Sequence, residues 1–147
     1  MRRFQFRLQR VLQWQERVCR IEEDKLRTCL SDVAETEERL ARLAAERVAI
    51  EQEFSSQQAL AAPDLQALAA FRHKAVLDRR ALEHELQNRQ TILDTQRQKL
   101  LAERRRLEVI EKLRERALQE YTRAVDKEVE ALSYESYLST WTSRASR

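Results

Sequence analysis

The side chains that most often carry catalysis or bind metals are present in this sequence, but their spacing suits neither task. The two histidines, His73 and His84, stand eleven residues apart, so they do not share one turn of a helix. Acidic residues pair with Arg and Lys at a spacing of four, which is typical of a solvated helix face. No serine, cysteine or lysine has a base and an orienting partner nearby in sequence. We therefore expect no enzyme, no cofactor and no small-molecule substrate.

The two cysteines, Cys19 and Cys29, are ten residues apart. On one helix this spacing is about 15 Å at ~1.5 Å per residue, which is too far for a disulfide bridge within the helix. We interpret them as reduced thiols that act as small core residues in a reducing compartment. An intermolecular disulfide or a metal site is the alternative, although we expect no metal.

Arginine and lysine give the chain its most distinctive chemistry because they are concentrated in two stretches. The net charge is only +3, from 28 basic and 25 acidic side chains. Residues 1–20 hold six arginines against Glu16, whereas residues 97–116 hold eight basic and four acidic side chains. Residues 30–60 lean acidic. A folded end that brings the two basic stretches together is positive and attracts an acidic surface.

These charges lie on a sequence with the period of a coiled coil. Apolar residues recur every seventh position, and a second seven-residue series interleaves with the first at spacings of three and four. The sequence has no glycine and one proline, so tight phosphate-binding loops and sheet corners are not expected. The series comprise Leu86, Leu93, Leu100 and Leu107; Leu12, Cys19, Leu26, Val33, Leu40, Arg47 and Phe54; and Leu8, Gln15, Glu22, Cys29, Thr36, Leu43 and Ile50.

We predict an all-α fold of two long helices in an antiparallel coiled-coil hairpin, with the second helix overhanging the first. The first helix is expected over about 4–54 and the second over about 63–132. Residues 55–63 form the predicted bend, because serine and glutamine dilute the pattern there and Pro63 suits the first turn of a helix. The whole chain is expected to form one elongated unit. A straight parallel dimer of long helices is the competing arrangement.

A fold back near residue 60 also predicts a register for the seam. It matches apolar residues at both ends and near the middle: Leu12 with Ile110, Leu40 with Leu82, and Phe54 with Leu68. Two layers between them are mixed, with Cys19 opposite Glu103 and Leu26 opposite Gln96. Polar seam positions of this kind lower stability but specify register.

The last residues, 133–147, form a tail of different composition, rich in serine. Tyr134, Leu138 and Trp141 share one face at helical spacing. This tail is either frayed or a short docking helix that becomes ordered on a partner. No apolar run approaches the ~18 residues of a membrane span, so no membrane insertion is expected.

Two further features suit protein partners. The opening segment from Phe4 to Leu12 carries more apolar surface than one seam needs, and part of it either covers the other helix or faces a partner. Phe71 lies off the seam near the bend, which makes it a candidate anchor. A basic stretch ahead of a leucine series is also typical of basic zippers, but Val76 and Leu77 do not suit a helix that reads a DNA groove.

The opening Phe4-Gln5-Phe6-Arg7-Leu8-Gln9-Arg10-Val11-Leu12 resembles the F-x-F-R-L-Q-x-V-L start of the flagellar FliJ family. The stretch from Arg105 to Arg116, followed by Tyr121, is similar to the family's second motif, R-R-x-L-E-x-L-x-E-R. The length, the hairpin and the absence of glycine agree with the family over nearly the whole chain. Residues 133–147 depart from it.

The resemblance implies a non-enzymatic component of the bacterial flagellar type III export apparatus, located in the cytoplasm at the inner face of the inner membrane. Such a protein is a stalk and adaptor that binds the hexameric export ATPase, the cytoplasmic domain of the export gate, and export chaperones. Matching the motifs gives an ATPase-binding set of Phe4, Phe6, Arg7, Leu8, Arg10, Val11, Arg105, Arg106, Arg114 and Arg116. Phe71 is the candidate for the gate contact. An injectisome stalk homologue, a generic coiled-coil scaffold and a weak nucleic-acid binder are the alternatives.

Overall fold

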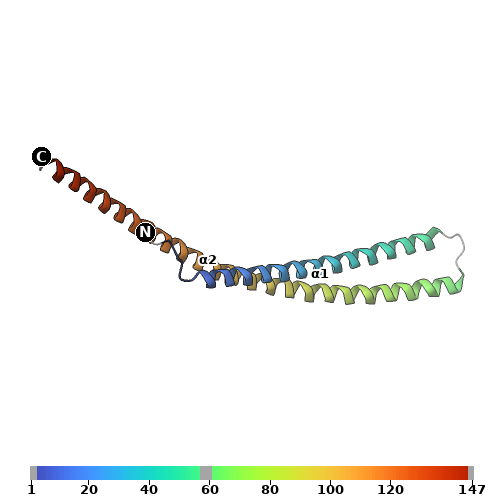
Figure 1. Cartoon of the computed structure of the whole chain (residues 1–147). Helices are drawn as coiled ribbons and strands as arrows, with labels where there is room; N and C mark the ends of the chain where they lie inside the picture. The colour runs from blue at the N-terminus through green and yellow to red at the C-terminus, as the bar shows by residue number, and fades with distance from the viewer. Residues whose placement is uncertain (1–2, 57–60, 146–147) are drawn as a thin grey trace. The chain divides into compact units, whose positions relative to one another are not determined.

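The computed structural model describes residues 3–56 and 61–145, and for residues 142–145 it describes the backbone alone. Two helices account for nearly all of these residues: α1 spans Gln9–Ser56 and α2 spans Ala62–Ala145 (Figure 1). No strand occurs among the residues described. The predicted all-α helical hairpin is therefore confirmed. Residues 57–60 of the predicted bend lie outside the described part.

The first helix begins at Gln9, five residues later than predicted. The Gln9 backbone N–H donates to the Phe6 carbonyl oxygen at 3.1 Å, and that of Leu12 donates to the Leu8 carbonyl at 3.0 Å. Residues 3–6 are not helical, and residues 7–8 form a turn. We call residues 3–8 the N-terminal strap. The late start has a physical reason. Phe4 and Phe6 are both half-buried, but on one helix residues two apart point about 200° away from each other. A helix through these residues could therefore pack only one of the two rings against α2.

The second helix starts close to the predicted position, and Asp64 explains why. Its carboxylate accepts a hydrogen bond from the Ala61 backbone N–H at 3.1 Å, and its own N–H donates to the Ala61 carbonyl at 3.0 Å. Pro63 occupies the first turn, where a missing N–H leaves no bond unmade. The helix then continues beyond residue 132 to Ala145, so the described part of the predicted tail is helical.

The chain divides into two compact units. Unit 1 comprises Met1–Cys19 and Ala102–Arg147, and unit 2 comprises Arg20–Leu101. Both helices contribute to each unit. In unit 2 the helices are antiparallel, because contacts later in α1 fall earlier in α2: Glu22 with Gln96, Asp32 with Arg89, Arg39 with Glu85, and Glu51 with Arg72.

The core of each unit is a thin seam at the heptad positions. In unit 1 the side chains of Leu12 and Cys19 are buried. In unit 2 the buried apolar side chains are those of Val33, Leu68, Ala75, Leu93 and Leu100. The free energy of folding therefore comes from one narrow row of contacts, and single seam residues carry a large share of it.

Polar residues interrupt this seam, and they bond to each other across it. In unit 1 the Gln15 amide, 3% exposed, donates to the Glu103 carboxylate at 2.7 Å and to its backbone carbonyl at 3.2 Å. In unit 2 the Gln96 amide donates to the carboxylate and the backbone carbonyl of Glu22. Glu103 was predicted to oppose Cys19, but it bonds to Gln15, one helical turn earlier on α1. Gln96 was predicted to oppose Leu26, but it bonds to Glu22, again one turn earlier. The mixed layers are satisfied glutamine–glutamate pairs.

The Glu22 carboxylate has a second partner on its own helix. Lys25 donates to it at 2.6 Å. The hydrogen bonds from Lys25 and then from Gln96 lower the pKa of Glu22 below its ordinary value of 4.5. The ionised carboxylate is therefore the form that this seam stabilises.

Candidate functional site

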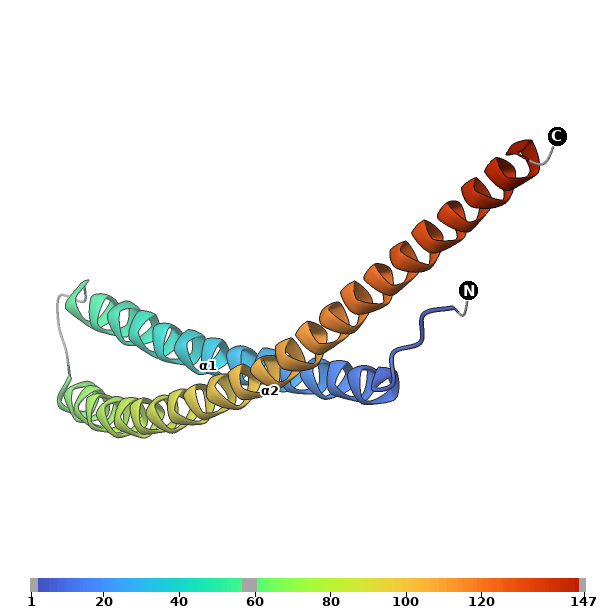
Figure 2. The same ribbon diagram turned by 90° about the vertical axis from the view of Figure 1, so that its left-hand side faces the viewer.

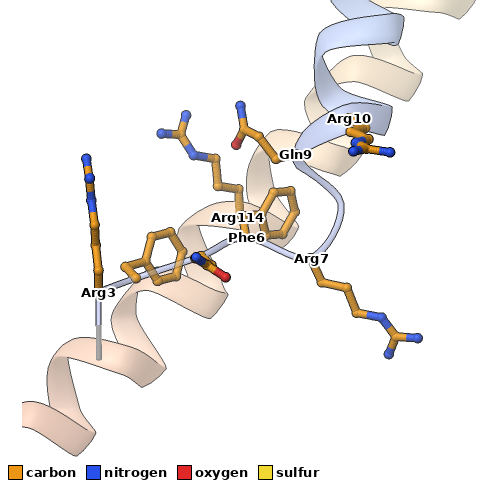
Figure 3. Close-up of a pocket in the computed structure, with 8 residues that line it drawn as sticks. Arg3, Phe6, Arg7, Gln9, Arg10 and Arg114 are labelled. Atoms are coloured by element: carbon orange, nitrogen blue, oxygen red, sulfur yellow. The ribbon is translucent and has the colours of Figure 1, made fainter. Parts of the chain in front are cut away.

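The N-terminal strap and α2 together form an open cleft in unit 1 (Figure 3). Its volume is about 680 Å³. Arg3, Arg7 and Arg10 from one side and Arg114 from α2 bring four guanidinium groups to its lining. Phe4, Gln5, Phe6 and Gln9 complete it.

Aromatic contacts hold the strap on α2. The ring of Phe4 packs on that of Tyr121, with centroids 5.5 Å apart and planes tilted by 54°. Phe6 is half-buried, and Figure 3 shows it beside Arg114. Tilted aromatic pairs at this distance contribute about 0.5–1.5 kcal/mol beyond the area they bury. The opening segment was predicted either to cover the other helix or to face a partner. Phe4 covers the other helix.

The cleft carries uncompensated positive charge. Among the residues that the structure describes, no carboxylate forms an ion pair with Arg3, Arg7, Arg10 or Arg114. Elsewhere on these helices arginines are paired, as Arg39 is with Glu85 at 3.3 Å. Four arginines around one open cleft give it a positive potential, and a guanidinium group suits carboxylate or phosphate through its fork of N–H donors.

The remaining residues of the predicted ATPase-binding set surround this cleft or lie farther along α2. Leu8 at the end of the strap and Val11 in the first turn of α1 are both exposed. Arg105, Arg106 and Arg116 are exposed on α2 outside the cleft lining, and Arg106 forms an ion pair with Glu103. Of the four α2 arginines in the set, Arg114 alone lines the cleft.

Three cleft residues were not in the predicted set, namely Arg3, Gln5 and Gln9. Arg3 belongs to the arginine-rich stretch 1–20, so its charge was the available signal. Gln9 gave no signal, because its role depends on where α1 begins.

Phe71, the predicted gate-binding residue, lies in unit 2 near the start of α2 and is half-buried. The predicted site residues thus fall into two separate sets, one around the strap and one near residue 71.

Metal sites in proteins are built from cysteine, histidine and carboxylate side chains. No group of three or more His, Cys, Asp or Glu is placed to hold a metal ion in the part of the chain described. Cys19 is buried and Cys29 half-buried, and neither forms a disulfide bond. Within that same part, neither helix has a stretch apolar enough to cross a bilayer.

A helical hairpin with a thin heptad seam, long charged surfaces and an open basic cleft defines a two-helix coiled-coil protein. The sequence model described as flagellar FliJ protein matches residues 4–132. The chain therefore belongs to the FliJ family. This family is a non-enzymatic component of the flagellar protein export apparatus. Comparisons with curated proteins and with solved structures gave no match.

Proposed function

We propose that this protein is a stalk and adaptor of flagellar protein export, which binds the hexameric export ATPase through the strap end of unit 1. Its second contact is with the cytoplasmic domain of the export gate, and it also meets export chaperones. In this role it works in the cytoplasm, peripheral to the inner membrane. It has no catalytic site or cofactor of its own.

The observation that carries the proposal is the set of unpaired arginines on the cleft. Arg7, Arg10 and Arg114 present fixed positive charge beside half-buried aromatic rings. A partner that supplies carboxylates neutralises the mutual repulsion of these guanidinium groups, so binding is favoured by both Coulomb attraction and hydrogen bonds. Arg105, Arg106 and Arg116 extend the positive surface along α2 and steer the approach of the partner.

The direct test is reversal of the cleft charge. The double variant Arg7→Glu/Arg10→Glu is expected to weaken binding to the export ATPase at least tenfold, since each residue is a charge facing an acidic partner. Surface plasmon resonance at physiological salt measures the affinity, and far-UV circular dichroism checks that the helices persist. The matched control is Lys74→Glu/Arg80→Glu, which makes the same change of charge at exposed positions of unit 2.

Undiminished ATPase binding by the cleft variant, or an equal loss in the control, would contradict the assignment. So would a salt-dependent shift of duplex DNA by a protein that leaves the ATPase unaffected, since that result belongs to a nucleic-acid binder.

Phe71 is the proposed contact for the export gate. Replacing a half-buried aromatic anchor by alanine typically weakens an interface by about 2 kcal/mol or more, a factor of about 30. Phe71→Ala is therefore expected to lose affinity for the isolated gate domain while ATPase binding is unchanged. Leu77→Ala, an exposed apolar truncation on the same helix, is the control. Equal gate binding by Phe71→Ala and the wild type would contradict this contact.

A further inference from the structure

Unit 1 leaves large apolar side chains exposed on one side of the paired helices. In heptad terms Leu12 and Gln15 of α1, and Leu107 and Ile110 of α2, are the a and d positions of the seam. Positions g and c of two antiparallel helices lie on the same side of such a seam. In unit 2 the ion pair between Arg39 and Glu85, both at position g, shows this geometry directly.

The g and c positions of unit 1 are apolar on both helices. We call this set the lateral face, and it comprises Val11, Trp14, Val18, Val109 and Leu113. Val18 is half-buried, and the other four side chains are exposed. Trp14 is 61% exposed. An exposed tryptophan in an apolar patch is a typical anchor for a partner.

A second apolar surface lies farther along α2 on the same side. We call it the aromatic stripe: Tyr134, Tyr137, Leu138 and Trp141. All four side chains are exposed, and Trp141 is 62% exposed. They occupy positions g, c, d and g of the continued heptad, so they share a side with Val109 and Leu113. Figures 1 and 2 both show α2 continuing past the point where the N-terminal segment ends.

The residues between these two apolar surfaces are charged, and their order is complementary to itself. Arg116, Glu120, Lys127 and Glu130 occupy the intervening g and c positions. Two α2 helices laid antiparallel, with a two-fold axis near Ala124, set Glu120 opposite Lys127 of the second copy and Arg116 opposite its Glu130. The same axis sets Leu113 opposite Tyr134 and Val109 opposite Leu138.

We propose that this side of α2 is a self-association surface, on which the aromatic stripe of one copy covers the lateral face of a second copy. The arrangement is two-fold symmetric, so each contact occurs twice. It runs over residues 106–141, with Trp141 opposite Arg106 of the second copy, which is roughly 54 Å of helix at ~1.5 Å per residue. Both tryptophans of the chain become buried in it.

The order of the charges and the types of the apolar residues both favour a second copy of this chain as the partner that covers this side of α2. Every charged pair along the axis is of opposite sign except at Arg123, which lies beside the axis and meets its own counterpart. The anchors are Trp and Tyr, whose rings bury apolar area and whose polar atoms still reach water at the edge. Arg114 occupies position a, away from this side, so the cleft remains open in the dimer.

Sedimentation equilibrium of the full chain tests the proposal. Over about 1 to 200 µM, a range suited to micromolar dissociation constants, the mass is expected to rise from monomer to dimer. The monomer mass is 17.5 kDa. Trp141→Ser is expected to weaken the dimer on the order of a hundredfold, because a hot-spot residue is lost twice. The matched control is Leu132→Ser, an exposed apolar residue on the opposite side of α2, which leaves association unchanged.

Charge reversal tests the register. Glu120→Lys and Lys127→Glu each place like charges opposite one another and weaken the dimer, whereas the double variant restores it. Arg123→Gln removes the one repulsive pair and strengthens it. Circular dichroism shows that each variant keeps its helices. A wild-type protein that stays monomeric throughout the range would overturn the proposal and leave this side to a different protein. A double variant as weak as the two single ones, or equal losses in Trp141→Ser and Leu132→Ser, would also overturn it.

Discussion

At the scale of single residues, the seam shows how a coiled coil accommodates polar groups. Gln15 and Gln96 are buried, yet each donates to a glutamate of the other helix. A buried amide without such a partner costs about 1–3 kcal/mol. The two glutamine–glutamate pairs avoid that cost, and they also fix the alignment of the helices, since a slip of one turn separates each amide from its carboxylate.

Thr36 is a buried polar seam residue whose hydroxyl bonds to its own helix rather than across the seam. The side chain is 0% exposed, and the hydroxyl donates to the Asp32 carbonyl at 2.9 Å. That carbonyl belongs to the helix ladder, so removal of the hydroxyl leaves no polar group unpaired. We predict that Thr36→Val raises the free energy of unfolding by about 1 kcal/mol through the added buried methyl group. Urea denaturation measures the change.

Thr28 gives the matched control for this prediction. Its hydroxyl makes the same bond to the Asp24 carbonyl, at 3.1 Å, on an exposed surface. Thr28→Val should therefore change stability by no more than about 0.5 kcal/mol. Equal effects of the two substitutions would show that burial of the threonine is not the cause.

Glu22 makes the stability of the seam depend on pH. Its pKa is lowered below the ordinary 4.5, so the folded state holds the proton less tightly than the unfolded state does. The stabilisation is complete above pH 4.5 and is lost as pH falls through the lowered pKa. We predict that the wild type loses more stability between neutral and strongly acidic pH than Glu22→Gln does. Parallel pH slopes of the unfolding free energy in the two proteins would contradict this assignment.

At the scale of the helices, the heptad pattern predicts most of what the structure contains. The two helices and the apolar seam follow from the seven-residue spacing of apolar residues, and the start of α2 follows from Pro63 after the serine–glutamine stretch. The start of α1 did not follow, because the strap is fixed by the contact of Phe4 with Tyr121, a residue of the other helix. The glutamine–glutamate pairs were also missed, since each bonded partner lies one helical turn from the residue that the predicted register placed opposite.

The candidate site was predictable in part for the same reason. The match to the family motifs identified Arg7, Arg10 and Arg114, which line the cleft. The sequence did not distinguish Arg114 from Arg105 and Arg116. The side of α2 that faces the strap depends on which of its residues occupy the a and d positions of the seam. The helical continuation of residues 133–145 was left open by composition, as serine and threonine are weak helix formers.

The narrow seam predicts a large effect from a single truncation. Leu12 is 1% exposed, and its side chain fills the first layer behind the strap. Leu12→Ala is expected to lower the free energy of unfolding by about 2–4 kcal/mol, through lost burial and a residual cavity. Thermal unfolding followed by circular dichroism measures the loss. Leu30→Ala, an exposed leucine on the same helix, should cost much less, and equal losses would contradict a core confined to the seam.

At the scale of the whole molecule, the two proposed binding surfaces both lie in unit 1. The strap and Arg114 form the basic cleft proposed for an acidic partner, and the g and c positions form the apolar side proposed for a second copy. Arg106 and Arg116 lie on that apolar side rather than in the cleft. The proposed self-association and the proposed ATPase binding therefore draw on overlapping arginines, and we predict that a high concentration of the chain reduces its affinity for the ATPase ring. Titration of the ATPase at two chain concentrations, with Trp141→Ser as the non-associating control, measures this effect.

The central claim is that the chain doubles back so that the strap lies on α2. A spin-label distance between positions 8 and 114 tests it most directly, with Cys19 and Cys29 replaced by alanine and the labelled protein diluted in unlabelled chain. We expect a separation within roughly 25 Å, because paired helices lie 8–10 Å apart and the labels add several ångströms. One continuous unpaired helix would place the labels roughly 160 Å apart at ~1.5 Å per residue, and a distance far beyond roughly 25 Å would contradict the doubling back of the chain.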